Sequence, residues 1–308
     1  YTNFNIGGCT FSKEGTYDGD IKHLEITLND QSNKEIESIY FSSCNCVQQD
    51  ETTFSIPSDF HPIKNVHFGC SSISSCTPPL VTDPPTIVIT TPPPGEYIDH
   101  DREVNPSTAL ELIRSYFRNY KFTNENGGAI LINDPRVSCS LDDCKFETCS
   151  AQNGGAIYVN YKTNAYAFVA SKCSFLSCES SENGGALYLQ NSLSVTQTFE
   201  ISGCTFTSNK AVNGGAIYGG VRDQFTLENN EFSNNEATIG SSLYLLAGSI
   251  SPKSTEHSIF NISSNIFSFT PSAEKTINVH IVNANSKNDK PYTNFNIGGC
   301  TFSKEGTY

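Results

Sequence analysis

One short motif recurs through the middle of the chain and constrains the fold more than any other feature. The letters GGAI or GGAL follow an asparagine four times, and a degenerate copy, GSSLYLL, comes later. The five copies begin at Gly127, Gly154, Gly184, Gly214 and Gly240. A phenylalanine precedes each copy, and the series continues at intervals of 24 to 35 residues as Phe122, Phe146, Phe175, Phe206, Phe232, Phe267 and Phe302. Repeats of this length are typical of solenoids, because one such unit cannot bury its apolar face alone.

The residues around each phenylalanine alternate with the period of a β-strand. In most copies a second phenylalanine lies seven residues upstream, an aliphatic residue or alanine five upstream, and a cysteine or asparagine two upstream. This pattern indicates two short strands separated by a bend, and the paired glycines suit a tight corner before a third strand. Three strands per repeat predict an all-β parallel β-helix, in which equivalent side chains of successive coils stack about 4.8 Å apart.

The cysteines predict an oxidising setting. The chain has 12 of them, and this density favours an extracellular protein with disulfides. Their spacing does not match the paired C-x₂-C pattern of structural zinc sites. Equivalent positions on adjacent coils lie within disulfide distance, so Cys144 can pair with Cys173 and Cys149 with Cys178. Pairing within a coil, Cys144 to Cys149 and Cys173 to Cys178, is the alternative. The other candidates are Cys44, Cys46, Cys70 and Cys76.

The first seventeen letters, YTNFNIGGCTFSKEGTY, are repeated without change at residues 292–308. Similarity of fold alone would preserve only the inward-facing letters, whereas the solvent-facing Ser12, Lys13 and Glu14 also match their counterparts. This identity predicts a tandem array with a period of 291 residues (292 minus 1), of which the chain is a window.

A proline-rich segment at 77–95, TPPLVTDPPTIVITTPPPG, divides the chain. Proline removes backbone donors and fixes φ, so we expect an extended strut here rather than a coil. The predicted domains are therefore 1–76, the last coils of one β-helix module; the linker 77–95; and 96–308, the β-helix module of the next repeat. A capping-box pattern predicts a short cap helix near 105–117, with the first strand as its alternative.

Two kinds of glycosylation site are predicted. Threonines among the prolines suit O-linked glycans, although a bare spacer fits the same letters. These threonines are Thr77, Thr82, Thr86, Thr90 and Thr91. One N-glycosylation sequon is present at Asn261, followed by Ile262 and Ser263. Because Asn261 stands between Phe260 and Ile262, which are predicted to face inward, its side chain should point outward.

The charged residues give little support for a catalytic or metal-binding site. The formal net charge of −13 gives no reason to expect a nucleic-acid partner, and no stretch of ~18 apolar residues predicts a membrane span. The acidic candidates are the pair Asp142 and Asp143 and the cluster DHDRE at 99–103. Consecutive strand residues face opposite ways, so the pair does not predict a shared groove. The cluster is a weak candidate for calcium. We expect no catalytic residue, no cofactor and no other metal site.

Taken together, these motifs resemble the repeats of chlamydial polymorphic outer-membrane proteins, whose hallmarks are GGA[ILV] and FxxN. FxxN occurs as Phe206–Asn209 and Phe232–Asn235, whereas FETC and FLSC place a cysteine where the family has asparagine. The resemblance covers about 115–245 strongly, and 1–70 and 246–308 only through the phenylalanine register. It implies a right-handed parallel β-helix displayed on a cell surface, often with an adhesive role.

Tandem β-helix modules joined by stiff struts predict a structural subunit of an extracellular filament or surface appendage. Its partners would be adjacent repeats or filament neighbours of the same kind, together with covalent glycans. A cell-surface adhesin for a host or glycan ligand is the second hypothesis, and saturable ligand binding would favour it. A polysaccharide-cleaving enzyme is the third, and its activity would have to depend on Asp142 or Asp143.

Overall fold

The structure is a computed structural model, and it describes residues 2–11, 21–28, 38–42, 45–46, 66–68, 97–133, 138–162, 166–191, 198–221, 224–247, 258–269, 276–283 and 293–304. Within these residues the chain forms strands and no helix. The paired strands are parallel and stack coil upon coil. The predicted all-β parallel solenoid is therefore confirmed.

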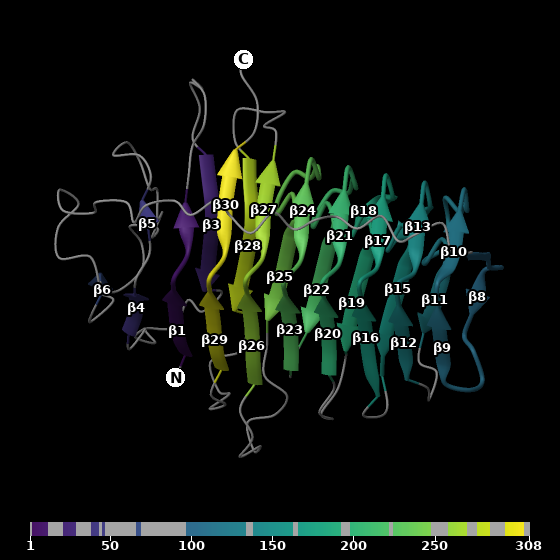
Figure 1. Ribbon diagram of the computed structural model, residues 1–308, viewed down its shortest axis with the longest axis horizontal. Coiled ribbons are helices and arrows are strands. Elements are labelled where there is room, and N and C mark those ends of the chain that lie inside the picture. The colour runs from purple at the N-terminus through teal and green to yellow at the C-terminus, as the bar shows by residue number, and fades with distance from the viewer. Residues whose placement is uncertain are drawn as a thin grey trace.

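Three long sheets run along the solenoid, and a typical coil contributes one strand to each of them in turn (Figure 1). The first sheet holds, in spatial order, β6 (Val66–Phe68), β4 (Ser38–Ser42), β1 (Thr2–Gly7), β29 (Thr293–Gly298), β26 (Ser258–Ser263), β23 (Gln224–Glu228), β20 (Thr198–Ser202), β16 (Ala167–Ser171), β12 (Cys139–Asp142) and β9 (Leu110–Ile113). The second sheet holds β5 (Asn45–Cys46), β2 (Thr10–Phe11), β30 (Thr301–Lys304), β27 (Ile266–Phe269), β24 (Glu231–Ser233), β21 (Thr205–Thr207), β17 (Ser174–Leu176), β13 (Lys145–Glu147), β10 (Ser115–Arg118) and β7 (Ile98–Asp99).

The third sheet holds β3 (Ile21–Leu28), β28 (Thr276–Asn283), β25 (Leu243–Ala247), β22 (Ile217–Val221), β19 (Leu187–Asn191), β15 (Ile157–Tyr161), β11 (Ile130–Asn133) and β8 (Glu103–Val104). A short fourth sheet pairs β14 (Ser150–Asn153) with β18 (Glu179–Asn183). In the chain, both strands lie between a strand of the second sheet and a strand of the third.

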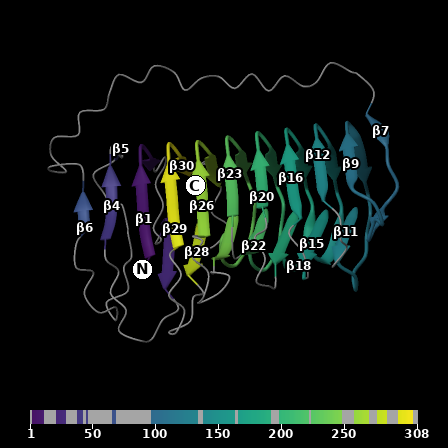
Figure 2. The same ribbon diagram turned by 90° about the horizontal axis from the view of Figure 1, so that it is seen from below.

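Spatial order departs from chain order at one place. From β7 to β30 the coils stack in the order of the sequence, but β1 lies directly beside β29. Figures 1 and 2 show the purple strand β1 next to the yellow strand β29, with β4 and β6 beyond it. The described strands within 1–76 therefore extend the same solenoid, and β6 and β7 lie at its opposite ends.

A ladder of phenylalanine rings fills the core beneath the second sheet. The rings of Phe146 and Phe175 stack with centroids 4.9 Å apart, and Phe175 and Phe206 follow at 4.8 Å. Phe232, Phe267 and Phe302 continue the stack at 4.8 to 5.0 Å. Since this spacing equals the rise between parallel strands, each ring is held by the ladder that its own coil helps to build.

The ladder position predicted for Phe122 belongs instead to Phe117, so that prediction is wrong. Phe117 pairs in register with Phe146, and their ring centroids lie 5.0 Å apart. Phe122 is half-buried and lies outside the ladder, with the Arg102 guanidinium 3.7 Å from its ring centroid. The other ladder phenylalanines with a glycine pair stand eight or nine residues before it, whereas Phe122 stands five before Gly127. Phe122 comes too late in its coil to reach the second sheet.

The two glycines of the repeated motif are needed for different reasons. Gly154 has a φ of 62°, and a Cβ there would lie 2.2 Å from the carbonyl oxygen of Ile157. For Gly155 the constraint is the neighbouring coil, because a Cβ would lie 2.1 Å from the carbonyl oxygen of Gly185. The first glycine therefore turns the chain, and the second lets successive coils approach closely.

Residues 105–117 form strands rather than the predicted cap helix, so the alternative holds. Leu110 and Leu112 are buried in β9, while Glu111 and Ile113 are exposed. This alternation has the two-residue period of a strand, and it places both leucines in the core. The segment supplies the first full coil of the solenoid.

Candidate functional site

Two buried columns of thiols and amides run through the corners of the solenoid on either side of the phenylalanine ladder. The first column, two residues before the ladder, consists of Cys144, Cys173, Cys204, Asn230, Asn265 and Cys300. The second column, three residues after the ladder, consists of Cys149, Cys178, Asn209 and Asn235. Cysteine and asparagine share equivalent positions in both columns, so one role must suit both side chains.

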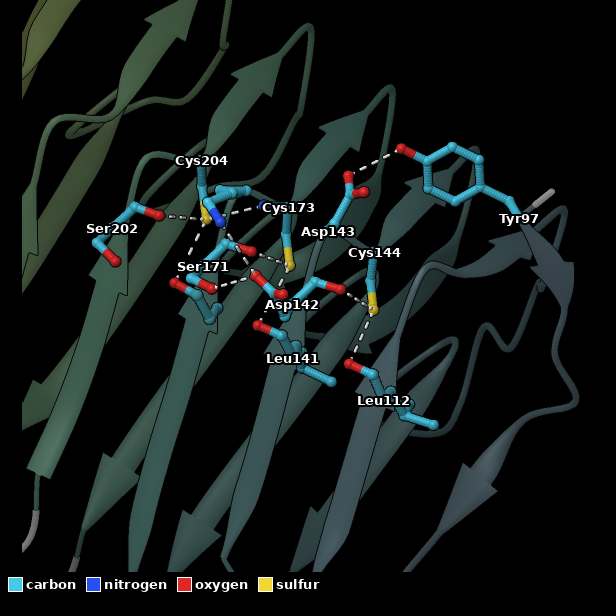
Figure 3. A network of polar contacts seen from close by, with 12 residues as sticks. Tyr97, Leu112, Leu141, Asp142, Asp143, Cys144, Ser171, Cys173, Ser202 and Cys204 are labelled. Atoms are coloured by element: carbon cyan, nitrogen blue, oxygen red, sulfur yellow. Dashed lines mark hydrogen bonds and ion pairs between the residues drawn. The ribbon is translucent and has the colours of Figure 1, made fainter. Parts of the chain in front are cut away.

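Thiol and amide make the same two contacts. Asn230 accepts a hydrogen bond from the backbone N–H of Cys204 (2.8 Å) and donates to the carbonyl of Ile201 (3.0 Å). Cys204 accepts from the N–H of Cys173 (3.3 Å) and donates to the carbonyl of Ala170 (3.5 Å). Figure 3 shows the thiol part of this network. Cys204 and Asn230 thus each link their own coil to the preceding one through both a donor and an acceptor.

The shape of the corner explains why a side chain is needed there. The residue just before a column member has a left-handed backbone, with φ of 53° at Lys172, 52° at Ser177 and 55° at Asn229. This left-handed residue interrupts the hydrogen-bond ladder between strands, as a β-bulge does. The backbone N–H of the next residue therefore points toward a side chain of the following coil. Buried N–H groups need a partner, and the columns supply it.

The predicted disulfides among Cys144, Cys149, Cys173 and Cys178 are not present in the structure, in either pairing scheme, because all four are free thiols. Their thiols donate instead to carbonyls of the preceding coil, as Cys144 does to Leu112 (3.4 Å). Burial raises the pKa of Cys178 far above that of an exposed thiol. A thiol held protonated is a poor nucleophile, so Cys178 is a structural group in this state.

The acidic pair is divided between two separate contacts. Asp142 accepts a hydrogen bond from Ser171 Oγ (2.7 Å) and lies 3.9 Å from Lys172 Nζ. Asp143 occupies a left-handed corner and accepts from the Tyr97 hydroxyl (2.9 Å), as Figure 3 shows. Burial, followed by this bond, raises the pKa of Tyr97. Both carboxylates therefore join coils to one another, and neither faces the other across a groove.

The DHDRE cluster at 99–103 forms the base of the solenoid. Asp99 pairs with Arg118 at 2.7 Å, and His100 Nδ1 lies 3.8 Å from Glu103 Oε1. Among the residues that the structure describes, no group of three or more histidine, cysteine, aspartate or glutamate side chains is placed to hold a metal ion. Asp99 and Glu103 are thus each engaged with a separate cationic or imidazole side chain.

Arg102 closes the base of the solenoid. Its Nε and Nη2 donate to the carbonyl of Gly127 (3.2 and 3.1 Å), and Nη2 also donates to the carbonyl of Asn126 (3.1 Å). One coil higher, the equivalent carbonyl of Asn153 accepts from the backbone N–H of Gly127 (3.0 Å). The guanidinium thus supplies donors that a preceding coil would supply, while it stacks on Phe122. No motif marks this role, and sequence analysis missed it.

A tyrosine ladder lies on the outer face of the third sheet. Tyr158, Tyr188, Tyr218 and Tyr244 stack with centroid distances of 4.7, 5.0 and 5.3 Å. Burial raises the pKa of each of these tyrosines, so their hydroxyls stay neutral well above pH 7. This ladder was not predicted, although its signal is present: a tyrosine directly follows the aliphatic residue of each motif copy from the second onward.

The predicted N-glycosylation site lies on the outer face of β26. Phe260 and Ile262 are buried, whereas Asn261 is half-buried and its Oδ1 accepts from Asn296 Nδ2 (2.8 Å). Its side chain faces outward, and its glycosylation stays a prediction. Other predicted residues lie outside the described residues: the linker 77–95 with Thr77, Thr82, Thr86, Thr90 and Thr91, and also Cys44, Cys70 and Cys76. Cys46 is described only as part of β5.

The duplicated segment forms two adjacent coils. Each residue of Thr2–Gly7 lies opposite the identical residue of β29, and β2 pairs with β30 in the same register. Ile6 and Cys9 are buried in this contact, and Cys9 Sγ donates to the carbonyl of Ile297 (3.8 Å). One end of the 97–304 solenoid therefore binds a second copy of its own last coil.

Comparisons with known proteins bear on these repeats. The family model of the Chlamydia polymorphic membrane protein (Chlamydia_PMP) repeat matches residues 203–220, which run from the corner before β21 through the FTSN letters to β22. The chain thus carries repeats of this type, folded as a parallel β-helix. Neither the comparison with curated proteins nor that with solved structures found a match. No helix among the described residues has the length and apolar character needed to cross a membrane.

Proposed function

We propose that the chain is a structural subunit of an extracellular filament or surface appendage, built from tandem β-helix repeats. The observation that carries this proposal is the in-register stacking of Thr2–Gly7 on Thr293–Gly298. A solenoid whose end accepts its own sequence can be continued by further units of the same kind. The matched repeat comes from a membrane-protein family, which supports display at a cell surface.

The mechanism of such a subunit is mechanical. The strands lie across the long axis, so the hydrogen bonds between coils lie along it and share an axial load across three sheets (Figure 1). The phenylalanine ladder and the two polar columns add contacts in the same direction at each step. A rod built this way resists stretching along its axis.

Two measurements test the filament proposal. An antibody against 97–304 should detect, in reduced, denatured and deglycosylated source material, a band far above the 33.6 kDa of this chain. Electron microscopy of the native material should show rods longer than one unit. A single band near 33.6 kDa together with short particles would contradict the proposal.

The tyrosine ladder supports a second candidate function, adhesion to a glycan. Stacked aromatic rings on an outer sheet face can pack against the apolar faces of sugar rings, with the hydroxyls as polar contacts. A glycan array should then show saturable binding that the double substitution Tyr188→Ala and Tyr218→Ala abolishes and Tyr188→Phe with Tyr218→Phe retains in part. Polysaccharide cleavage has the least support, because Asp142 and Asp143 are engaged in separate contacts.

A further inference from the structure

We propose that the coil formed by β1, β2 and β3 is exchangeable between molecules. The surface offered by β28, β29 and β30 would bind β1–β3 of a second copy of this chain, in the same register that it uses within one chain. This inference rests on the proposed filament function, for which it names the partner and the contact.

The contact involves all three sheets. Strand β1 pairs with β29 over Thr2–Gly7, β2 pairs with β30, and β3 pairs with β28 from Ile21 to Leu28. A partner held on three sides is fixed in register and in rotation about the long axis. The contact therefore has the same parallel geometry as any step inside the solenoid.

Identical sequence is what makes the fit complete. A stacked coil needs apolar, polar and corner residues at the same positions as the coil below it. Gly8 and Gly299 turn the same corner with φ of 61° and 62°. The Cys9 thiol donates to the Ile297 carbonyl, as the Cys300 thiol does to the Ile262 carbonyl (3.6 Å). A second copy of the segment brings all of these groups with it.

Connectivity allows the same contact within one chain or between two. Strands β6 and β7 lie at opposite ends of the first and second sheets, at least nine strand spacings, or about 43 Å, apart. Residues 69–96 join them in sequence. Within one chain, the linker holds β1–β3 near β28–β30 at an effective concentration near the millimolar range. When the concentration of chains is as high, β1–β3 of one chain can bind β28–β30 of another, and the chains join head to tail.

The test uses two variants whose introduced cysteines lie in different chains and can therefore meet only across molecules. One chain carries Asn5→Cys and the other Asn296→Cys, since these residues lie opposite each other in the register of β1 and β29. Both carry serine in place of Cys44, Cys46, Cys70 and Cys76. The chains are refolded together at high concentration, oxidised with copper–phenanthroline and separated without reductant. A cross-linked dimer of the two variants is expected.

Asn261→Cys serves as the matched control in place of Asn296→Cys. It is the same residue on the same outer column, but β29 separates its strand from β1. A single chain carrying both Asn5→Cys and Asn296→Cys should cross-link within itself and shows that the contact forms. Dimer with Asn296→Cys and not with Asn261→Cys supports the proposal. Equal dimer with both, or with neither while the single chain cross-links, overturns it.

A deletion provides a second measurement that needs no cysteine. Removal of 77–95 leaves nine residues between Phe68 and Tyr97, which reach roughly 35 Å when fully extended and cannot span the solenoid. The expected result in light scattering is a shift from monomer to dimer mass or higher. A glycine–serine segment of the original length should restore the monomer. A deleted chain that stays monomeric up to its solubility limit would overturn the exchange.

The outcomes separate this inference from the filament proposal. Long fibres without Asn5–Asn296 cross-links would leave the filament function standing and show that another surface joins the units. Specific cross-links that yield only closed dimers would support the exchange and contradict a filament built by it.

Discussion

The two ends of the 97–304 solenoid solve the same problem by different means. At the β7 end, one side chain imitates a missing coil, because Arg102 donates to the carbonyls of Asn126 and Gly127. At the β29 end, a real coil with an identical sequence supplies the partners. The first device cannot be extended, since a guanidinium has no further edge to offer. The second device repeats the surface that it covers.

This difference indicates how far each end is covered. Parallel stacking leaves unpaired backbone groups at any end, and such edges invite pairing with another chain. Arg102 satisfies the carbonyls of Asn126 and Gly127 with a planar fork that stacks on Phe122, while β7, β8 and β9 remain the edge strands of the three long sheets. The β29 end pairs with a whole coil, so the capped end is covered only in part.

The strongest test places one substitution in each copy of the duplicated segment. Ile297 and Ile6 are both buried, and an aspartate at either position should cost about 4 kcal/mol locally. Ile297→Asp should release both β29 and the coils stacked on it. Ile6→Asp should release only the strands between residues 2 and 68. Hydrogen exchange should therefore find β29 protected in Ile6→Asp and unprotected in Ile297→Asp. Equal loss at β29 would mean that the two coils fold as one unit.

The capped end should be sensitive to one arginine. Arg102→Ala exposes two carbonyls without their donors and removes the stacking on Phe122, at a cost of about 2–3 kcal/mol in denaturant unfolding. Arg118→Ala is the matched control, because its half-exposed pair with Asp99 should contribute less than about 1 kcal/mol. Arg102→Lys should fall between them, since lysine lacks the planar fork. Equal effects of the two alanine variants would argue against the cap.

Asparagine should replace cysteine at Cys204, the position where the first column changes from thiols to amides. Cys204→Asn should leave stability nearly unchanged, because an amide at this corner can accept from Cys173 N–H and donate to the Ala170 carbonyl. Cys204→Ala should cost about 1 kcal/mol, since it leaves a buried N–H and a carbonyl without that partner. Thermal unfolding at pH 7 measures both. An asparagine variant less stable than the alanine variant would contradict the shared role.

Alkaline pH should weaken the thiol-rich half near the capped end. Burial raises the pKa of Cys139, so above about pH 8.5 the unfolded chain loses a proton that the folded chain keeps. Stability is thus full at neutral pH and falls as pH rises. The melting temperature should drop between pH 7.5 and 9.5, by about 2–4 °C per kcal/mol lost. Cys139→Val should flatten this slope, and an unchanged slope would assign it to other groups.

The phenylalanine ladder and the polar columns could be predicted because a solenoid repeats its chemistry at fixed positions. Phe146 through Phe302 and the cysteine and asparagine columns all followed from register in the sequence. The error at Phe122 arose where the first coil has an unusual distance between its ring and its glycines. Local letters cannot show which of two phenylalanines, Phe117 or Phe122, reaches the second sheet.

Features that depend on an end of the stack were beyond the sequence patterns. Arg102 stands among acidic residues, and its partners are backbone carbonyls, which no residue type in the sequence identifies.

The role of the thiols was also missed. They were expected to pair because stacked cysteines lie at disulfide distance. The equivalence of Cys204 with Asn230 shows instead that each thiol has the same hydrogen-bonding task as an amide. That role is visible only once the corner geometry is known.

Because the paired strands are parallel, the molecule has a direction. From β7 to β30 the coils stack in the order of the sequence, so the first and the last coil are not equivalent. A rod made from such coils has a distinct head and tail, even when its units are alike. The two tips would then expose different groups, and units would join each tip at a different rate. A cell that anchors the capped tip would always present the other tip to its surroundings.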